Sequence, residues 1–195
     1  MSRSRLCLLL AATVVAGTSL TVDAAQRKPQ TAPEEFSSPL QGRTDTGALA
    51  STILIKIERY TPEAERQKMT DAMKFGGYPG FLQALRKAPA VGSIVIGDLQ
   101  VPLRWAREQP TAKGGRAISL VVDSPVYFVG GGRVDAKPRT GFELAVVQLT
   151  VDDYGLGFGT MAAAAKVKPD GAGGVLLEDY AEEPIKLTSV HRVIK

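Results

Sequence analysis

The sequence predicts an α+β fold dominated by strands, namely an antiparallel meander of about eight strands that forms a barrel or a two-layer sandwich. Short segments of alternating or continuous apolar residues recur from residue 53 to the C-terminus, and turns rich in glycine, proline or aspartate separate them. Helical patterning is confined to residues 61–88. Most connections between neighbouring apolar segments are short enough for tight hairpins, which favours antiparallel pairing.

The first predicted strand covers 53–57, where isoleucine at every second position alternates with other residues. A helix is expected next, with Thr61 as its cap and Pro62 in its first turn. The glycines at 76–77 are predicted to end it, and a second short helix is predicted over 80–88. We expect this helix–turn–helix insertion after the first strand to plug one end of the sheet or to cover one face.

The remaining chain is expected to consist of strands and turns. Val101, Leu103 and Trp105 alternate with polar residues, so we expect them to share one face. The segment 142–151 is apolar on both faces, which is typical of a central strand. The strands predicted after the helices are 93–96, 101–105, 116–123, 126–129, 142–151, 156–167, 175–180 and 185–194.

Residues 1–25 have the organisation of a cleavable secretory signal peptide. Arg3 and Arg5 begin it, an apolar stretch of about a dozen residues follows, and Ala24 and Ala25 each fit the last position before cleavage. The apolar stretch is shorter than the ~20 residues of a membrane-spanning helix. We therefore expect an exported protein, periplasmic or extracellular, with no transmembrane segment after cleavage.

Cys7 is the only cysteine and lies at the start of the apolar stretch, whereas a lipid-attachment cysteine follows its end. We therefore do not expect a lipoprotein, and cleavage leaves a mature chain without disulfides or thiol chemistry. It also lowers the net charge from +4 to about +3. No run of four basic residues occurs, so a nucleic-acid partner is not expected.

Three regions divide the chain. After the signal peptide, residues 26–48 are polar, contain prolines and lack periodicity, which predicts a disordered linker. Residues 49–195 are expected to form a single β-rich domain, long enough for one hydrophobic core. Because it has no disulfides, this domain must depend on that core for its stability.

Weak candidates for ligand binding come from two places. Gly155, Gly157 and Gly159 alternate along one predicted strand and leave one of its faces bare, either for close packing or for a ligand in a hollow interior. Arg104 and Trp105 belong to the only cluster of aromatic and basic residues, where a charged face opposite a buried tryptophan is the favoured interpretation.

No catalytic residue set, metal site or cofactor site is predicted. Ser189 and the only histidine, His191, share a strand but lack the turn and the oxyanion site of a catalytic triad. The paired acids at 152–153 and 182–183 lack the spacing of a calcium loop. The glycines at 130–132 with Arg133 are interpreted as a surface loop rather than an anion-binding nest.

Several segments together resemble a family of exported bacterial proteins whose activity is uncharacterised. The resemblance covers most of residues 52–192, and it implies export from a bacterial cell without transferring any functional residue. The segments that carry it are Ile53-Leu54-Ile55-Lys56-Ile57-Glu58, Leu82-Gln83-Ala84-Leu85-Arg86-Lys87-Ala88-Pro89, Leu103-Arg104-Trp105-Ala106-Arg107-Glu108, Leu176-Leu177-Glu178-Asp179-Tyr180 and Glu183-Pro184-Ile185-Lys186-Leu187.

These observations favour a non-enzymatic binding or interaction module of the cell envelope, with a small apolar ligand or another envelope protein as the candidate partner. The alternative is a carboxylate-based hydrolase. It requires two carboxyl groups about 5–10 Å apart in a cleft. Glu108, Asp123 and Glu143 lie near predicted strand ends and are its candidates, although nothing in the sequence brings them together.

Overall fold

The computed structural model describes residues 32–194, except for 45–46, 128–138 and 182. The predicted signal peptide and the glycine-rich loop with Arg133 lie outside this range. Within the described residues, the chain forms nine strands and one helical element. They are β1 (Glu34–Thr44), β2 (Gly47–Ile57), α1 (Glu63–Lys87), β3 (Gly92–Ile96), β4 (Leu99–Pro110), β5 (Arg116–Val122), β6 (Leu144–Val151), β7 (Gly157–Pro169), β8 (Val175–Tyr180) and β9 (Ile185–Arg192).

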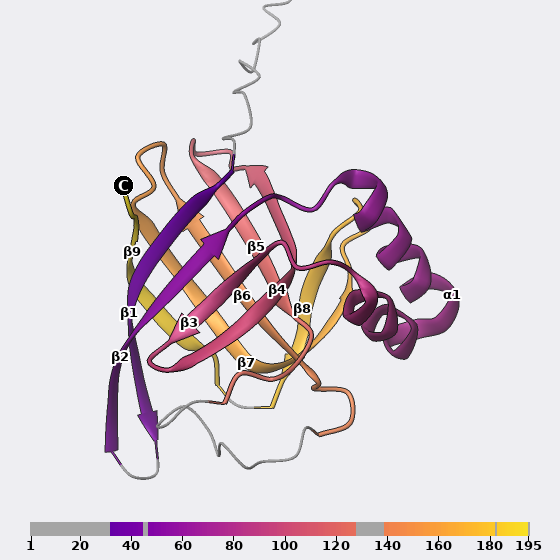
Figure 1. Cartoon of the computed structure of the whole chain (residues 1–195), viewed down its shortest axis with the longest axis horizontal. Coiled ribbons are helices and arrows are strands. Elements are labelled where there is room, and N and C mark those ends of the chain that lie inside the picture. Colours follow the sequence, from indigo (N-terminus) through magenta and orange to yellow (C-terminus); the bar gives the residue numbers. More distant parts are fainter. Residues whose placement is uncertain (1–31, 45–46, 128–138, 182, 195) are drawn as a thin grey trace, which may run out of the picture.

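Eight of these strands close into an antiparallel barrel. Hydrogen-bonded neighbours follow the order β1, β2, β3, β4, β5, β6, β7 and β9, and β9 pairs back with β1. The ninth strand, β8, pairs with the C-terminal half of β7. Figure 1 shows the tilted strands surrounding a common interior, with α1 beside one wall. Of the two predicted architectures, the barrel is confirmed.

The strand β1 corrects the prediction of a disordered linker, which is wrong for residues 34–44. Phe36 and Leu40 are fully buried in the barrel, and Ser38 and Glu34 share their side of the strand. These two polar residues hide the alternation from a search for apolar periodicity. Pro39 lies in the segment where the register between β1 and β9 shifts, an irregularity at which a strand tolerates the missing N–H.

The barrel interior is filled by apolar side chains. Each of the eight barrel strands directs side chains inward, so all eight contribute to one continuous core. Removing this apolar surface from water is the main stabilising contribution available to a domain without disulfides. The inward-facing residues include Phe36, Leu40, Ile53, Ile55, Ile57, Ile94, Ile96, Leu103, Ala106, Ile118, Leu120, Val122, Ala145, Val147, Leu149, Val151, Met161, Leu187 and Val190.

A second core lies outside the barrel, where α1 covers the wall formed by β4, β5, β6 and β7. Trp105 is fully buried there, and its ring meets the edge of Phe81 with 6.2 Å between ring centroids. The small residues of β7 allow the helix to approach closely. This core contains Met69, Met73, Phe81, Leu82 and Leu85 from α1, and Trp105, Val121, Leu144, Val146, Ala162, Ala165, Val167 and Val175 from the strands.

The residues of α1 form a single helical element, so the predicted helix–turn–helix is not what the structure shows. The glycine pair interrupts the element without ending it, because Gly77 alone leaves helical geometry (φ +61°, ψ −161°). The ribbon changes direction there (Figure 1). Thr61 does not cap the helix. Its hydroxyl accepts a hydrogen bond from the Ala106 N–H at 2.9 Å, which attaches the start of α1 to β4.

Two strand predictions also need correction. Leu103 faces the barrel interior whereas Trp105 faces α1, because the register shifts between them and Arg104 is an extra residue opposite β5. Val126 and Tyr127 belong to no strand, and 128–129 lie outside the described residues. By contrast, β6 has buried residues on both faces over its first half, as a central strand should.

The start of β7, which contains Gly157 and Gly159, packs against the neighbouring strands rather than lining a void. Gly157 pairs with Val151 and Val190, and Gly159 pairs with Leu149 and Leu187, all four of which point into the core. A Cβ atom added to Gly157 would overlap the Thr150 carbonyl oxygen, and one added to Gly159 would overlap that of Gln148. The absent side chains therefore allow two strands to approach closely.

Replacing Gly157 with alanine is expected to lower the free energy of unfolding by about 1–3 kcal/mol, the usual cost of overpacking. The matched control is Gly76→Ala in α1, where an added Cβ meets nothing within 4 Å. That change should be neutral or slightly stabilising. Urea denaturation followed by circular dichroism measures both. A Gly157→Ala variant as stable as the wild type would contradict the packing described here.

Candidate interaction surface

A buried ion network occupies the barrel interior beside Phe36. The Arg116 guanidinium donates to both Glu34 oxygens at 2.8 and 2.6 Å and to Glu108 at 2.8 Å, and its positive charge lies 5.7 Å from the centre of the Phe36 ring. The Tyr60 hydroxyl donates to Glu34 and accepts from Arg116. Four strands or their ends thus meet at one cation, which ties β1 to β4 and β5.

The electrostatics of this network favour a charged Arg116 and a neutral Tyr60. Burial alone lowers the pKa of Arg116, but its hydrogen bonds to Glu34 and Glu108 outweigh burial and raise that pKa above its ordinary value. Burial and the neighbouring Glu34 carboxylate raise the pKa of the Tyr60 phenol. Tyr60 therefore stays neutral and Arg116 stays charged at any physiological pH. Such a network suits a structural role better than proton transfer.

The predicted cluster of aromatic and basic residues is also engaged within the fold. Arg104 donates to Asp123 at 2.9 Å and to the Ala88 carbonyl at 3.0 Å, so it fastens the end of α1 to the end of β5. Trp105 is covered by α1. Arg104 and Trp105 are adjacent in the sequence, but their side chains contact different neighbours. They therefore do not form one site.

A second arginine of β4 fastens the β7–β8 hairpin. Arg107 donates to Asp170 at 2.6 Å and to the Ala172 carbonyl at 2.8 Å. Burial alone raises the pKa of Asp170, but the N–H groups of Gly174 and Ala172, together with Arg107, hold it below its ordinary value. This pair attaches the hairpin to the barrel wall.

The three carboxylates proposed for a hydrolase do not share a partner. Glu108 belongs to the network around Arg116, Asp123 binds Arg104, and the Glu143 backbone N–H donates to the Tyr78 hydroxyl at 3.1 Å. Each is therefore positioned by a different part of the fold. The carboxylate that accompanies Glu108 is Glu34, which lies in the segment predicted to be a linker.

Ser189 and His191 are exposed on the outer side of β9. Within the described residues, no group of three or more histidine, cysteine, aspartate or glutamate side chains is arranged to hold a metal ion. Across the same residues, no helix combines the length and the apolar character that a membrane crossing requires.

The most exposed group of large apolar side chains lies on the β6–β7 hairpin. We call Tyr154, Leu156 and Phe158 the apolar strip. They occupy alternate positions, and their exposed fractions are 79%, 55% and 63%. The Asp152 N–H donates to the Leu156 carbonyl at 2.8 Å, which extends the hairpin ladder beyond Gly157. Leu156 and Phe158 therefore project from the same outer face.

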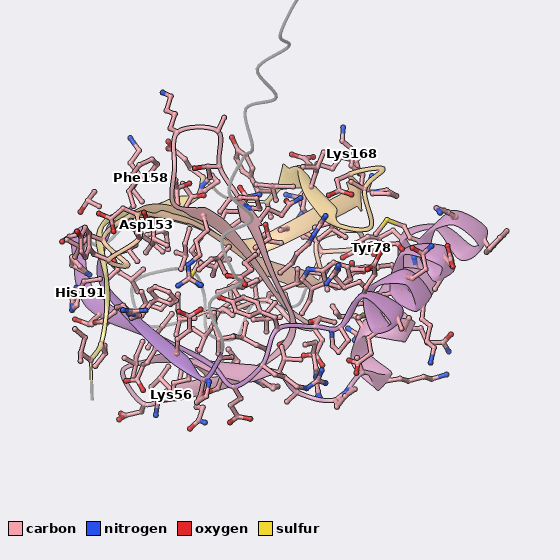
Figure 2. The ribbon with its side chains drawn as sticks, turned by 90° about the horizontal axis from the view of Figure 1, so that it is seen from above. Lys56, Tyr78, Asp153, Phe158, Lys168 and His191 are labelled. Atoms are coloured by element: carbon pink, nitrogen blue, oxygen red, sulfur yellow. The ribbon has the colours of Figure 1, made fainter. Side chains whose placement is uncertain are left out.

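The residues beside Phe158 on β6 and β7 are uncharged, whereas Asp152, Asp153 and Arg192 border the turn end of the apolar strip. Thr150 lies directly opposite Phe158 on β6, and Thr160 follows it along β7; both are exposed. In Figure 2, Phe158 and Asp153 lie on the side of the barrel away from α1 and Tyr78. The helix thus covers one wall of the barrel, and no element among the described residues covers the wall of the apolar strip. An exposed apolar patch with aromatic rings and charges at its border has the composition of an interface core with a polar rim.

Leu156 and Phe158 were not singled out from the sequence, although a signal was present. The glycines at 155, 157 and 159 alternate with large apolar residues at 154, 156 and 158. Since the glycine face packs inward against β6 and β9, the apolar face has to point outward. That conclusion requires knowing which face is internal, and the sequence left this open.

Comparisons with known proteins identify no relative: no protein-family model, curated protein or solved structure matches this chain significantly. The function therefore has to be inferred from the geometry of the molecule.

Replacing Arg116 with methionine is expected to lower the free energy of unfolding at pH 7 by about 3–5 kcal/mol, because the buried Glu34 and the partly buried Glu108 would then lack a cation. The matched control is Arg59→Met, which breaks the half-exposed ion pair with Glu65 and should cost less than about 1 kcal/mol. Chemical denaturation measures both. Equal losses for the two variants would show that the network around Arg116 is not a stabilising feature.

Proposed function

We propose that this protein is an exported, non-enzymatic interaction module that binds a partner protein through the apolar strip of the β6–β7 hairpin. The observation that carries the proposal is the exposure of Tyr154, Leu156 and Phe158 on a wall that no other described element covers. Burying three large apolar side chains against a partner removes them from water, which is the main favourable contribution to most protein association.

Two further features support a binding role on the outside of the barrel. The interior is occupied by the apolar core, so the small apolar ligand considered from the sequence has no evident place behind Gly157 and Gly159. Arg116 and Arg107, two of the least exposed cations, are engaged in ion pairs that hold the fold together. Within the part of the chain that the structure describes, the wall that carries the apolar strip is therefore the best candidate to meet a partner.

Export is part of the same proposal, and it rests on the organisation of residues 1–25. When the full chain is produced in a bacterium, intact-mass measurement of the purified protein should give a mature N-terminus directly after Ala24 or Ala25. A variant with Leu9 and Leu10 both replaced by arginine, which disrupts the apolar stretch, should keep the full-length mass and stay in the cytoplasm. A full-length mass for the wild-type protein in the envelope fraction would contradict cleavage.

The binding surface is tested by site-specific photocrosslinking in the cells that produce the protein. A photoreactive phenylalanine analogue at Phe158 should give a discrete crosslinked adduct, because this side chain would lie in the interface. The same analogue at the exposed Lys56 on β2 is the matched control and should give none. No adduct at position 158, or equal adducts at both positions, would refute the proposed surface.

A further inference from the structure

We infer that Asp152 is the positioning residue of the proposed interaction surface: its carboxylate holds Tyr154 and Leu156 in the arrangement that binds the partner, before the partner arrives. This inference rests on the proposed function and adds how the surface is prepared for binding. It follows from the hydrogen bonds of the β6–β7 turn, from the attachment of that turn to β9, and from a comparison with the β7–β8 turn of the same chain.

The Asp152 side chain closes the β6–β7 turn from within. Its Oδ1 atom accepts hydrogen bonds from the Tyr154 and the Leu156 N–H groups, both at 2.9 Å. The Asp152 N–H donates to the Leu156 carbonyl at 2.8 Å, and the Gly155 N–H donates to the Asp152 carbonyl at 3.1 Å. Aspartate favours turns because its side chain bonds the backbone a few residues further on. Here one side chain fixes the backbone at two of the three residues of the apolar strip.

The turn is also attached to the end of β9. The Arg192 N–H donates to the Gly155 carbonyl at 3.0 Å. Gly155 is buried and has a φ of +83°, and a Cβ atom added to it would lie 2.6 Å from the Arg192 Cβ. Only glycine therefore fits at this contact. Since Gly155 lies between Tyr154 and Leu156, both exposed side chains project from a part of the turn that the barrel holds in place.

The β7–β8 turn has the same hydrogen bonds but is built from small residues. Asp170 Oδ1 accepts from the Ala172 and the Gly174 N–H groups, both at 2.7 Å. The Asp170 N–H donates to the Gly174 carbonyl at 3.0 Å, and Gly173 has a positive φ at the fourth position, as Gly155 does. This backbone arrangement therefore forms without large apolar side chains.

The two turns differ in the side chains that they present. In the β7–β8 turn, Arg107 binds Asp170, and a Cβ atom added to Gly174 would overlap the Arg107 guanidinium. This turn is thus packed against the barrel wall. The corresponding positions of the β6–β7 turn carry Tyr154 and Leu156, both exposed. Turn formation does not explain these large apolar side chains, which a binding surface would use.

A turn that is ordered in the free protein lowers the cost of binding. Association requires interface side chains and loops to become ordered, and this cost is avoided where the free protein already has the bound arrangement. Without the Asp152 carboxylate, the backbone at Tyr154 and Leu156 would lose two hydrogen bonds. The partner would then have to order the turn itself. We expect weaker binding, although the apolar strip would keep all of its side chains.

The test compares Asp152→Ala with Asp152→Asn by photocrosslinking from position 158 in cells. Alanine removes the acceptor, so the adduct yield should fall about fivefold or more. Asparagine removes the charge but keeps an oxygen that accepts the same two N–H groups, so it should restore most of the wild-type yield. Amide hydrogen exchange of the purified mature proteins, followed by NMR, should be faster at residues 154 and 156 in Asp152→Ala alone.

Asp170→Ala is the matched control, because it removes the same kind of turn hydrogen bonds from a hairpin end that carries no part of the apolar strip. It also breaks the ion pair with Arg107, so it should lower the unfolding temperature. Its adduct yield at position 158, measured per folded molecule, should equal that of the wild type. Asp152→Ala should show the reverse, with an unfolding temperature close to the wild-type value and a reduced adduct yield.

Three results would overturn the inference: an undiminished adduct in Asp152→Ala, an equal loss in Asp152→Asn, or an equal loss per folded molecule in Asp170→Ala. An equal loss in Asp152→Asn would mean that the charge of Asp152, rather than its hydrogen bonds, matters for binding. Each of these results includes a wild-type adduct at position 158 and therefore leaves the proposed function in place. The absence of that adduct in the wild type refutes the interaction function itself, and this inference with it.

Discussion

Barrel closure depends on β1, the strand that joins β2 to β9. Without it, the sheet would have two open edges, and open edges of this kind promote pairing with other chains. The N-terminal end of β1 is held by Glu34, whose carboxylate forms an ion pair with Arg116 at the start of β5. One buried ion pair therefore connects the closing strand β1 to β5, which is not its neighbour in the sheet. The same contact aligns the inward face of β1 with the rest of the core.

The division of the barrel wall into a covered and a bare part follows from where apolar residues occur on the outward faces. Trp105, Val121 and Val146 point out of the barrel and need α1 to shield them from water. On the hairpin that begins β7, the outward face carries the apolar strip, which no described element shields. One group of outward-facing apolar side chains is thus buried under α1, and the other is exposed. This difference is the basis for assigning the exposed group to a partner.

Sequence patterning predicted most strands, the dominance of β structure and the central position of β6, because alternation and two-sided apolar runs reflect burial directly. It failed where burial is not apolar. The strand β1 was missed because Glu34 and Ser38 face inward, and only the distant Arg116 makes that burial favourable. The bulge at Arg104 was missed because a one-residue register shift leaves no compositional trace. The apolar strip was missed because its orientation depends on which side of the barrel is inside.

The burial of Trp105 beneath α1 has a spectroscopic consequence. It is the only tryptophan in the sequence, and its ring lies between the barrel wall and Phe81 of the helix. Its fluorescence emission therefore reports on a single structural event, the contact between α1 and the outer wall, while the interior core contributes no indole signal. Helix detachment and barrel unfolding can thus be distinguished in the native chain without a label, by comparing emission with the circular dichroism of the strands.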